Sequence, residues 1–105
     1  MTWQTVVKPE EGKVTCFLIM DDSLEKNAFV ICFQGQFYAY ENRCPHMGTT
    51  LDWVEGQFFS EQWLMCQTHG ALFNPINGDC VSGPCSHGLR RLKLRDEQDH
   101  LLIHA

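Results

Sequence analysis

Two short segments of the chain combine cysteine and histidine at close spacing. One reads Cys44-Pro45-His46 and the other reads Cys66-Gln67-Thr68-His69. A single tight loop of this length can direct a thiolate and an imidazole to the same point. A glycine follows each segment and permits the backbone conformations that such loops need. The two pairs therefore predict a metal centre with two sulfur and two nitrogen ligands.

Nineteen residues separate His46 from Cys66, which is enough for a hairpin that brings the two segments face to face. Two thiolates and two imidazoles suit either a tetrahedral zinc ion or a binuclear iron–sulfur cluster with mixed ligands. Zinc ribbons more often carry Cys-x-x-Cys pairs, so the spacing favours the cluster and leaves structural zinc as an alternative. A single buried cysteine is usually only a small apolar residue, but two such pairs in one loop-rich stretch argue against coincidence.

The elements that must position these segments are predicted to be strands. Short apolar runs of strand length alternate with turns, and the Gln34-Gly35-Gln36 turn joins two of them in a predicted hairpin. A second turn, residues 74–78, separates the strand-like pieces 72–73 and 80–81, and a closing hairpin is expected between residues 89 and 103. One helical turn through residues 24–26, after the polar residues 21–23, is the only helix that we expect.

These elements predict one all-β domain over residues 1–105, a length that suffices for a single core. An all-β frame, residues 1–41 and 89–105, forms the base and holds a loop-rich insert, residues 42–88. The insert contains both Cys/His segments. It carries four acidic residues and one basic residue, Arg43.

Composition excludes several classes of protein. The formal net charge of −5 argues against nucleic-acid binding, which requires a basic surface. No apolar run reaches the roughly 18 residues of a membrane span, and the N-terminal residues lack the features of a signal peptide. We therefore expect a soluble cytoplasmic protein that does not bind membranes. In that compartment six cysteines indicate metal or redox chemistry rather than a disulfide framework.

Three stretches of sequence carry a resemblance to a known family. They are C-P-H-M-G-T-T-L (44–51), C-Q-T-H-G-A-L-F (66–73) and G-D-C-V-S-G-P-C (78–85). Together they resemble the Rieske-type [2Fe–2S] domain, in particular the soluble, low-potential Rieske ferredoxins of bacterial ring-hydroxylating oxygenases. The resemblance implies that Cys44 and Cys66 bind one iron and that His46 and His69 bind the other. It also implies an all-β fold with a Rieske-like antiparallel β-sandwich or barrel as its base. A loop-rich cluster-binding subdomain is inserted in this base, and Gly83-Pro84 covers a third side of the cluster.

The chain departs from the Rieske proteins of quinol-oxidising complexes in its ligand loops. Those proteins have an extra cysteine in each loop, joined by a disulfide, whereas this chain has Met47 in the first loop and Gln67 and Thr68 in the second. Hydrogen bonds to the sulfurs raise the reduction potential of such a centre. We therefore expect a potential towards the low end of the Rieske range, about −150 to +300 mV.

The resemblance implies a one-electron carrier rather than an enzyme. The expected partners are a flavin-dependent reductase and a terminal oxygenase or another redox protein, and the expected state is a monomer. A small accessory subunit of a nitrite reductase-like enzyme is one alternative, although many such subunits lack the ligands. A structural zinc domain is the other.

The remaining cysteines and basic residues have simpler interpretations. We expect Cys16 and Cys32 to be buried thiols in strands. Cys80 and Cys85 are expected to be thiols packed beneath the cluster loops, with a redox-active disulfide as the alternative. His100 and His104 are expected at the surface. The basic residues Arg90, Arg91, Lys93 and Arg95 are expected to solvate an edge strand, with docking as the alternative.

Overall fold

The computed structural model describes residues 3–43, 59–60, 63–66, 70–83 and 87–105, and all the regular structure in these ranges is β-strand. The strands are β1 (Gln4–Val6), β2 (Val14–Asp21), β3 (Leu24–Phe33), β4 (Gln36–Glu41), β5 (Phe59–Ser60), β6 (Trp63–Met65), β7 (Leu72–Phe73), β8 (Cys80–Ser82), β9 (Lys93–Asp96) and β10 (Leu101–His104). They form three sheets with the orders β1-β10-β9, β2-β3-β4 and β5-β6-β7-β8. Every pairing between these strands is antiparallel, so the predicted all-β antiparallel fold is confirmed.

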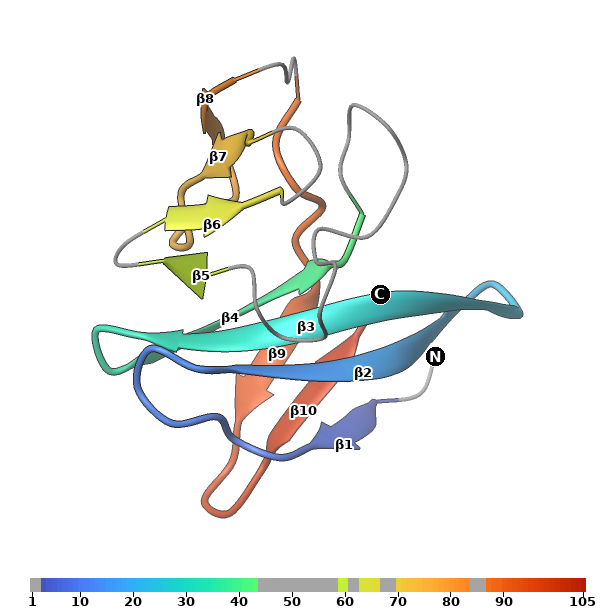
Figure 1. Ribbon diagram of the computed structural model, residues 1–105. Helices are drawn as coiled ribbons and strands as arrows, with labels where there is room; N and C mark the ends of the chain where they lie inside the picture. Colours follow the sequence, from blue (N-terminus) through green and yellow to red (C-terminus); the bar gives the residue numbers. More distant parts are fainter. Residues whose placement is uncertain (1–2, 44–58, 61–62, 67–69, 84–86) are drawn as a thin grey trace.

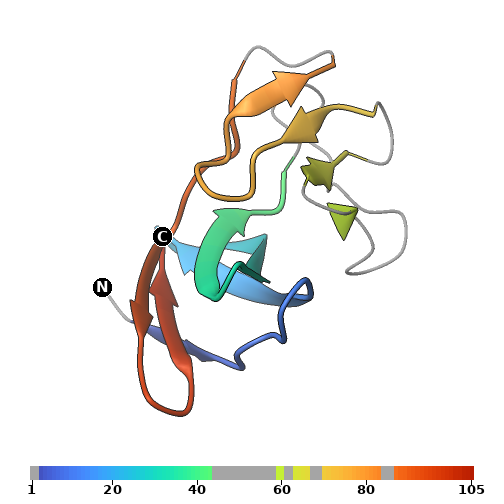
Figure 2. The ribbon, with the colours of Figure 1, turned by 90° about the vertical axis from the view of Figure 1, so that its left-hand side faces the viewer.

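The sheets are arranged in layers (Figure 1). The two three-stranded sheets pack against each other, and the four-stranded sheet β5–β8 lies beyond the sheet β2-β3-β4. The view turned by 90° shows the four-stranded sheet standing apart from β1, β9 and β10 (Figure 2). No helix long and apolar enough to cross a membrane occurs in the described ranges.

Residues 28–32 of strand β3 are buried on both faces because this part of the strand lies between two apolar cores. Alternate side chains of a strand point to opposite faces, so Ala28 and Val30 enter one core while Phe29 and Ile31 enter the other. We call the first the base core; its buried members are Val6, Ile19, Ala28, Val30, Ala39, Leu92, Leu101 and Ile103. We call the second the interlayer core; its buried members are Phe29, Ile31, Tyr40, Leu64, Cys66, Ala71, Phe73 and Leu89.

The predicted helical turn after residue 23 is wrong. Asp22 and Ser23 have φ angles of 51° and 69°, and Asp21 pairs directly with Leu24 across a two-residue hairpin turn. Such turns require positive φ at both central residues, which aspartate tolerates better than most residue types. Leu24 therefore begins β3 instead of a helix.

The predicted hairpin around Gly35 is confirmed as β3 and β4. Gln34 and Gly35 adopt φ angles of 53° and 78°, and both donate their backbone N–H groups to the carboxylate of Glu11, at 2.7 and 2.8 Å. These two hydrogen bonds, that from Gly35 first, hold the pKa of Glu11 below its ordinary value. The loop before β2 is thereby fixed to the end of the hairpin.

The predicted closing hairpin is β9 and β10, and β1 adds to its far side. Because β10 is the central strand of this sheet, His104 is buried and not at the surface as expected. Its ring packs edge-on against Trp3, with 4.1 Å between ring centroids. We expected His104 at the surface because it lies near the end of the chain. Burial depends instead on the position of a strand within its sheet, and β10 is the central strand.

Candidate metal centre

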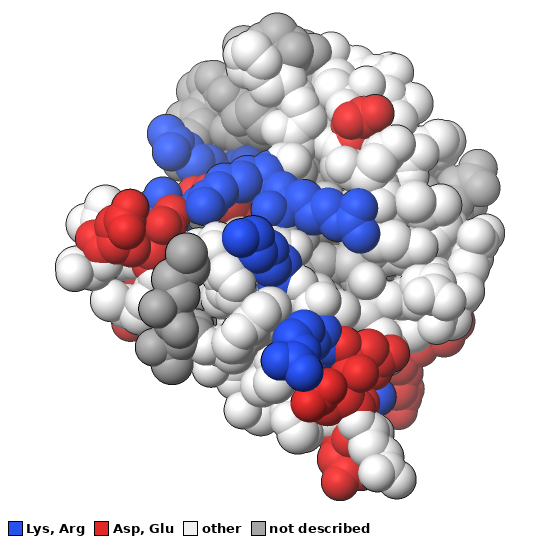
Figure 3. Space-filling model, turned by 180° about the vertical axis from the view of Figure 1, so that it is seen from behind, with Lys and Arg blue, Asp and Glu red and all other residues white. Residues whose placement is uncertain are grey.

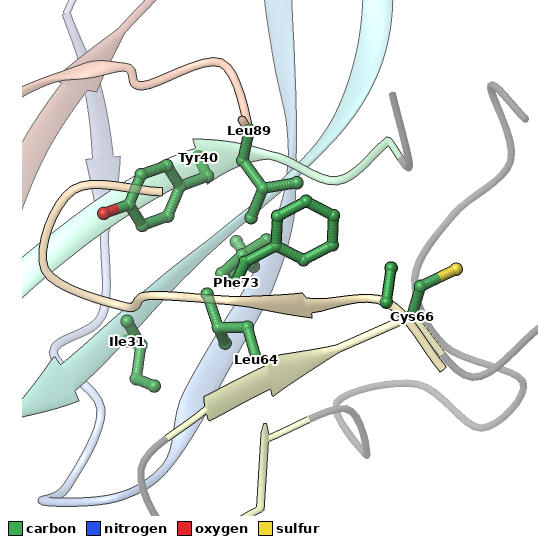
Figure 4. Packing of buried hydrophobic residues seen from close by; sticks show 8 residues of the cluster. Ile31, Tyr40, Leu64, Cys66, Phe73 and Leu89 are labelled. Atoms are coloured by element: carbon green, nitrogen blue, oxygen red, sulfur yellow. The ribbon is translucent and has the colours of Figure 1, made fainter. Parts of the chain in front are cut away.

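Cys66 is the one predicted ligand that lies within the described residues. It directly follows β6 and is completely buried. Figure 4 shows its sulfur directed away from Leu64 and Phe73, toward the end of the β6–β7 hairpin. The other three predicted ligands, Cys44, His46 and His69, lie outside the described residues.

The hairpin that carries Cys66 is closed by backbone hydrogen bonds. Cys66 donates to the carbonyl of Ala71 at 2.9 Å and accepts from Gly70 at 2.7 Å. Gly70 has a φ of 71°, the left-handed conformation that glycine adopts without steric cost. These bonds keep the backbone of Cys66 close to that of Gly70, the residue that follows His69 in the sequence.

A second loop packs directly against this hairpin at Gly83. A Cβ atom at Gly83 would lie 2.8 Å from the Cα of Ala71, closer than real Cβ contacts come, and Gly83 also has a positive φ of 94°. Only glycine satisfies both conditions. The backbone at Gly83 thus lies against Ala71 of the Cys66 hairpin, and a larger residue at position 83 would prevent this close contact.

The turn between β7 and β8 is built largely from asparagine side chains. Asn74 accepts from the N–H of Ile76 and Asn77 accepts from the N–H of Asp79, each at 2.9 Å. Asparagine commonly stabilises turns in this way. Gly78, which follows Asn77, donates its backbone N–H to the carbonyl of Asn74 at 2.7 Å. These bonds confirm the predicted turn and set the position of β8 relative to β7.

Tyr40 of β4 connects the base to this turn. Its buried hydroxyl donates to the carbonyl of Pro75 at 2.6 Å. A Cβ atom at Gly78 would lie 2.8 Å from Cε1 of Tyr40, so the ring and the turn are in close contact. Burial raises the pKa of Tyr40 well above its ordinary value, which keeps the hydroxyl protonated as a donor.

The Tyr40→Phe variant tests the contribution of this hydrogen bond. We expect its free energy of unfolding to fall by about 1–3 kcal/mol, because the buried carbonyl of Pro75 loses its donor. Urea unfolding followed by tryptophan fluorescence measures the change. Tyr38→Phe is the matched control, since the Tyr38 hydroxyl has no hydrogen bond to any described residue. Equal effects of the two substitutions would contradict this role of Tyr40.

The interlayer core joins the base to the Cys66 hairpin through packing. Phe73 and Leu64 from the four-stranded sheet meet Ile31 and Tyr40 from the sheet β2-β3-β4, and Leu89 closes the group (Figure 4). All five are at most 6% exposed. Burial of this apolar surface is the main force that holds the layer carrying Cys66 on the base.

A group of charged side chains holds the chain where it returns from the insert. The guanidinium of Arg90 lies 2.7 Å from Asp21 and 3.5 Å from Glu41. Lys26 contacts the same two carboxylates, at 3.2 and 3.9 Å. The hydrogen bond from Arg90, and then that from Lys26, holds the pKa of Asp21 below its ordinary value. Glu41 also donates its backbone N–H to the carbonyl of Arg90 at 2.9 Å.

The lowered pKa of Asp21 predicts a pH dependence of stability. A depressed folded-state pKa gives a contribution that is complete above the unfolded pKa and is lost as the pH falls through the folded value. We therefore expect Asp21→Asn to reduce stability at neutral pH and to flatten its decline below about pH 4. Urea midpoints measured between pH 6 and pH 3 test this.

Asp22→Asn is the matched control for that experiment, because Asp22 has no ion pair with any described residue and asparagine tolerates its positive φ. Other acid-sensitive contributions are common to both variants and cancel in the comparison. If the urea midpoint of Asp21→Asn fell with decreasing pH as steeply as that of the wild type, the contact between Asp21 and Arg90 would contribute nothing to the acid sensitivity of the fold.

The described part of the site fits a metal cofactor of the predicted kind. Thiolate sulfur is a ligand for zinc and for iron–sulfur clusters, and Cys66 places a buried sulfur at the end of a strand, directed out of the interlayer core. No group of three or more His, Cys, Asp or Glu side chains suited to a metal occurs among the described residues.

One expectation about the cysteines is wrong. Cys80 is disulfide-bonded, whereas we expected a thiol packed beneath the loops. Its partner is not among the other described cysteines, since Cys16, Cys32 and Cys66 are not in disulfides, and Cys85 lies outside the described residues. The expectation relied on the redox state of the cytosol. Disulfide formation also depends on whether the backbone brings two sulfurs within reach, which that reasoning did not consider.

The two thiols predicted in the base strands differ in burial. Cys32 is 7% exposed and Cys16 is half-buried, so full burial is confirmed only for Cys32. Burial, with a smaller effect of the nearby Glu11 carboxylate, raises the pKa of the Cys32 thiol. A protonated, buried thiol is chemically inert.

Two residues that support the site were not identified from the sequence. Tyr40 was assigned only to a strand, and Arg90 only to a basic patch, yet each makes a hydrogen bond to a residue at least 35 positions away in the chain. The only available signal was Glu41, an acidic residue in an otherwise apolar strand end. A carboxylate that is 8% exposed requires a cationic partner.

Comparison with known proteins identifies a family. The model of the family described as the Rieske [2Fe–2S] domain matches residues 2–93. The iron–sulfur subunit of the cytochrome b6-f complex of Chlorobaculum thiosulfatiphilum is 28% identical over 93 residues, which cover 89% of this chain and 46% of that protein. The ferredoxin component of the alkene monooxygenase system of Xanthobacter autotrophicus is 29% identical over 79 residues, covering 75% of this chain and 62% of that protein.

Solved structures support the fold. The ferredoxin of carbazole 1,9a-dioxygenase from Nocardioides aromaticivorans aligns with a TM-score of 0.71 at 24% identity, covering 99% of this chain and 95% of that one. The ferredoxin from Sphingomonas yanoikuyae aligns with a TM-score of 0.75 at 14% identity, covering 100% and 99%. At these identities the alignments establish a shared fold. The chain spans less than two thirds of the length of the two curated relatives.

Proposed function

The chain belongs to the Rieske [2Fe–2S] domain family, and from this premise we propose that it is a ferredoxin, a soluble one-electron carrier and not itself an enzyme. The cofactor of the family is a Rieske-type [2Fe–2S] cluster. The observation that carries the proposal is the position of Cys66, whose buried sulfur lies at the closed end of the β6–β7 hairpin.

We propose that Cys44 and Cys66 bind one iron through their thiolates and that His46 and His69 bind the other through their imidazoles. The bound cluster supplies reversible one-electron oxidation and reduction. Each imidazole that replaces a thiolate removes a negative charge from the centre, which makes a reduced state easier to reach than with four cysteines. The two ligand pairs therefore predict a potential above that of plant-type ferredoxins.

The residues of the hairpin and base serve to hold these ligands in place. The backbone bonds between Cys66 and Ala71 limit the movement of the loop, and complete burial keeps water from the sulfur side chain of Cys66. The Tyr40 hydroxyl fixes the neighbouring turn to the base. Rigid packing around the ligands reduces their movement when the cluster gains or loses an electron. The positions of the ligands are then set by packing and not by the oxidation state.

For the whole protein we propose a place in a short electron-transfer chain. The name of the Xanthobacter relative describes a ferredoxin component of a monooxygenase system. In our proposal for this chain, a flavin-dependent reductase supplies the electrons and an oxygenase or other redox enzyme receives them. We further propose a cytoplasmic monomer in which residues 1–105 form one Rieske domain, with the base at 1–41 and 89–105 and the cluster-binding insert at 42–88.

Metal analysis and spectroscopy test the proposal. Protein purified without oxygen should be red-brown, contain about two iron and two sulfide per chain, and give a rhombic EPR signal after chemical reduction. Protein-film voltammetry should place its potential towards the low end of about −150 to +300 mV. A colourless protein with one zinc per chain would support a structural zinc domain instead. A potential well above zero would contradict the low-potential assignment.

A further inference from the structure

The two sheets of the base are joined along only part of the seam between β4 and β9. Leu92 donates to the carbonyl of Ala39, and Glu41 donates to the carbonyl of Arg90, both at 2.9 Å. These two bonds flank a single antiparallel β-bridge, in which Tyr40 pairs with Arg91. Along the rest of the seam, in the part of the chain that the structure describes, no backbone hydrogen bond joins β4 to β9.

The open part of the seam leaves backbone groups of both strands without a strand partner. Successive residues of an antiparallel strand direct their N–H and C=O groups to opposite edges. Ala39 and Glu41 direct theirs toward β9, so Phe37, two residues before Ala39, does the same. Leu94 likewise directs its groups toward β4, as Leu92 does. Neither Phe37 nor Leu94 has a backbone bond across the seam to any described residue.

A groove of about 440 Å³ occupies this opening. It is lined by Phe37, Tyr38, Ala39, Arg91, Leu92, Lys93 and Leu94. Phe37 and Leu94 are only half-buried and pack on the edge of the base core, so the floor of the groove is apolar. An apolar floor beside two free strand edges is what an added strand requires.

The rim of the groove is basic. Arg91, Lys93 and Arg95 are exposed and alternate with the inward-facing Leu92 and Leu94. Figure 3 shows a band of Lys and Arg side chains across one face of the molecule. Among the described residues no carboxylate lies within ion-pairing distance of these three cations, in contrast to the network around Arg90.

The spacing of the three cations matches that of an extended peptide. Residues two apart on one face of a strand repeat every 6.5–7 Å or so. An extended segment with an acidic residue at every second position has the same repeat, whereas consecutive acidic residues point to opposite sides. The guanidinium of Arg91 also lies 5.6 Å from the centre of the Tyr38 ring, which holds it over the groove.

We propose that this open seam is a docking surface for an extended acidic segment of a partner protein. The segment adds as a strand to the edges at Phe37 and Leu94, and its alternate carboxylates pair with Arg91, Lys93 and Arg95. The surface lies on the base and uses none of the cluster ligands. A partner bound there therefore leaves the Cys66 hairpin accessible, and the proposal does not depend on the proposed function.

A pair of isomeric peptides tests the spacing. Fluorescein-labelled Glu-Val-Glu-Val-Glu-Val is titrated with the full chain in the cluster-loaded form, and Glu-Glu-Glu-Val-Val-Val has the same charge and composition. We expect the alternating peptide to bind at least about tenfold more tightly, since only it can pair all three carboxylates while extended. Amide hydrogen exchange should slow at Phe37 and Leu94 when it binds. Equal binding of the isomers, no binding, or binding without this protection would overturn the proposal.

Charge-reversal variants locate the site. Lys93→Glu is expected to weaken binding of the alternating peptide by about tenfold or more. Lys13→Glu is the matched control, because Lys13 is also exposed, has no ion pair with a described residue and lies before β2. We expect its affinity to stay within about twofold of the wild type. Equal losses of affinity in the two variants would show that the peptide responds only to the overall charge of the protein, and this result would overturn the assignment. The iron content measured on the same samples reports separately on the cluster.

Discussion

Replacing Cys66 with serine is expected to abolish the stable [2Fe–2S] cluster, with iron falling from about two atoms per chain to well under one. A serine hydroxyl is not ionised at neutral pH and is a harder ligand than the thiolate that iron–sulfur clusters require. Cys66 is completely buried, so water cannot readily take the place of the missing sulfur. Iron and sulfide analysis, with visible absorbance of the same sample, measures the loss.

The matched control for this prediction is Cys32→Ser. Cys32 is also buried and its thiol contacts a Glu11 carboxylate oxygen at 3.7 Å, an interaction that a serine hydroxyl can retain. Because Cys32 lies on β3 and is not a proposed ligand, its replacement should leave the iron content unchanged. Full visible absorbance in Cys66→Ser would exclude Cys66 as a ligand, and equal losses in both variants would point to a general folding defect.

Phe73→Ala is expected to have the largest effect on stability, a loss of about 3–5 kcal/mol in the free energy of unfolding. Phe73 is completely buried and lies in the interlayer core, where it packs with Leu64 and Leu89 (Figure 4). Removing the ring deletes apolar contacts and leaves a cavity between the base and the β5–β8 sheet. Since small domains have only about 5–15 kcal/mol of stability, the change is easily measured by urea unfolding.

Val81→Ala on the adjacent strand β8 is the control for the loss of a side chain alone. Val81 is 47% exposed, and we expect its replacement to change stability by no more than about 0.5 kcal/mol. Phe73→Ala should also release iron faster than the wild type, because the interlayer core supports the hairpin of Cys66. A loss below about 1 kcal/mol in Phe73→Ala would mean that the two layers are held together by other contacts.

Strands and short hairpins could be predicted because their signals are local. The apolar run of β3 was sufficient to place a strand, and Gly35 was sufficient to place the turn after it. The burial of both faces of β3 was not predicted, because it depends on the layer contributed by residues 59–82. The Asp22-Ser23 turn was also missed, since its sequence suits a helix start as well as a tight turn.

The chemistry of the site was likewise predictable where it is local. The spacing of Cys66 and His69 predicts a metal ligand within one tight loop, and the backbone bonds from Cys66 to Gly70 and Ala71 are consistent with such a loop. The supporting contacts of Tyr40 and Arg90 were not predictable, because their partners are distant in the chain and are selected by the fold.

The pairing of β1 with β10 has a consequence for how the protein is made. The hairpins β2–β3 and β3–β4 have two-residue turns and can close as soon as their residues leave the ribosome. Strand β1, however, has its partner at residues 101–103, at the other end of the described chain. The base therefore cannot be completed until the whole insert has emerged. Until residues 101–103 are available, β1 remains unpaired and the base is incomplete, although the β2–β3 and β3–β4 hairpins can already have formed.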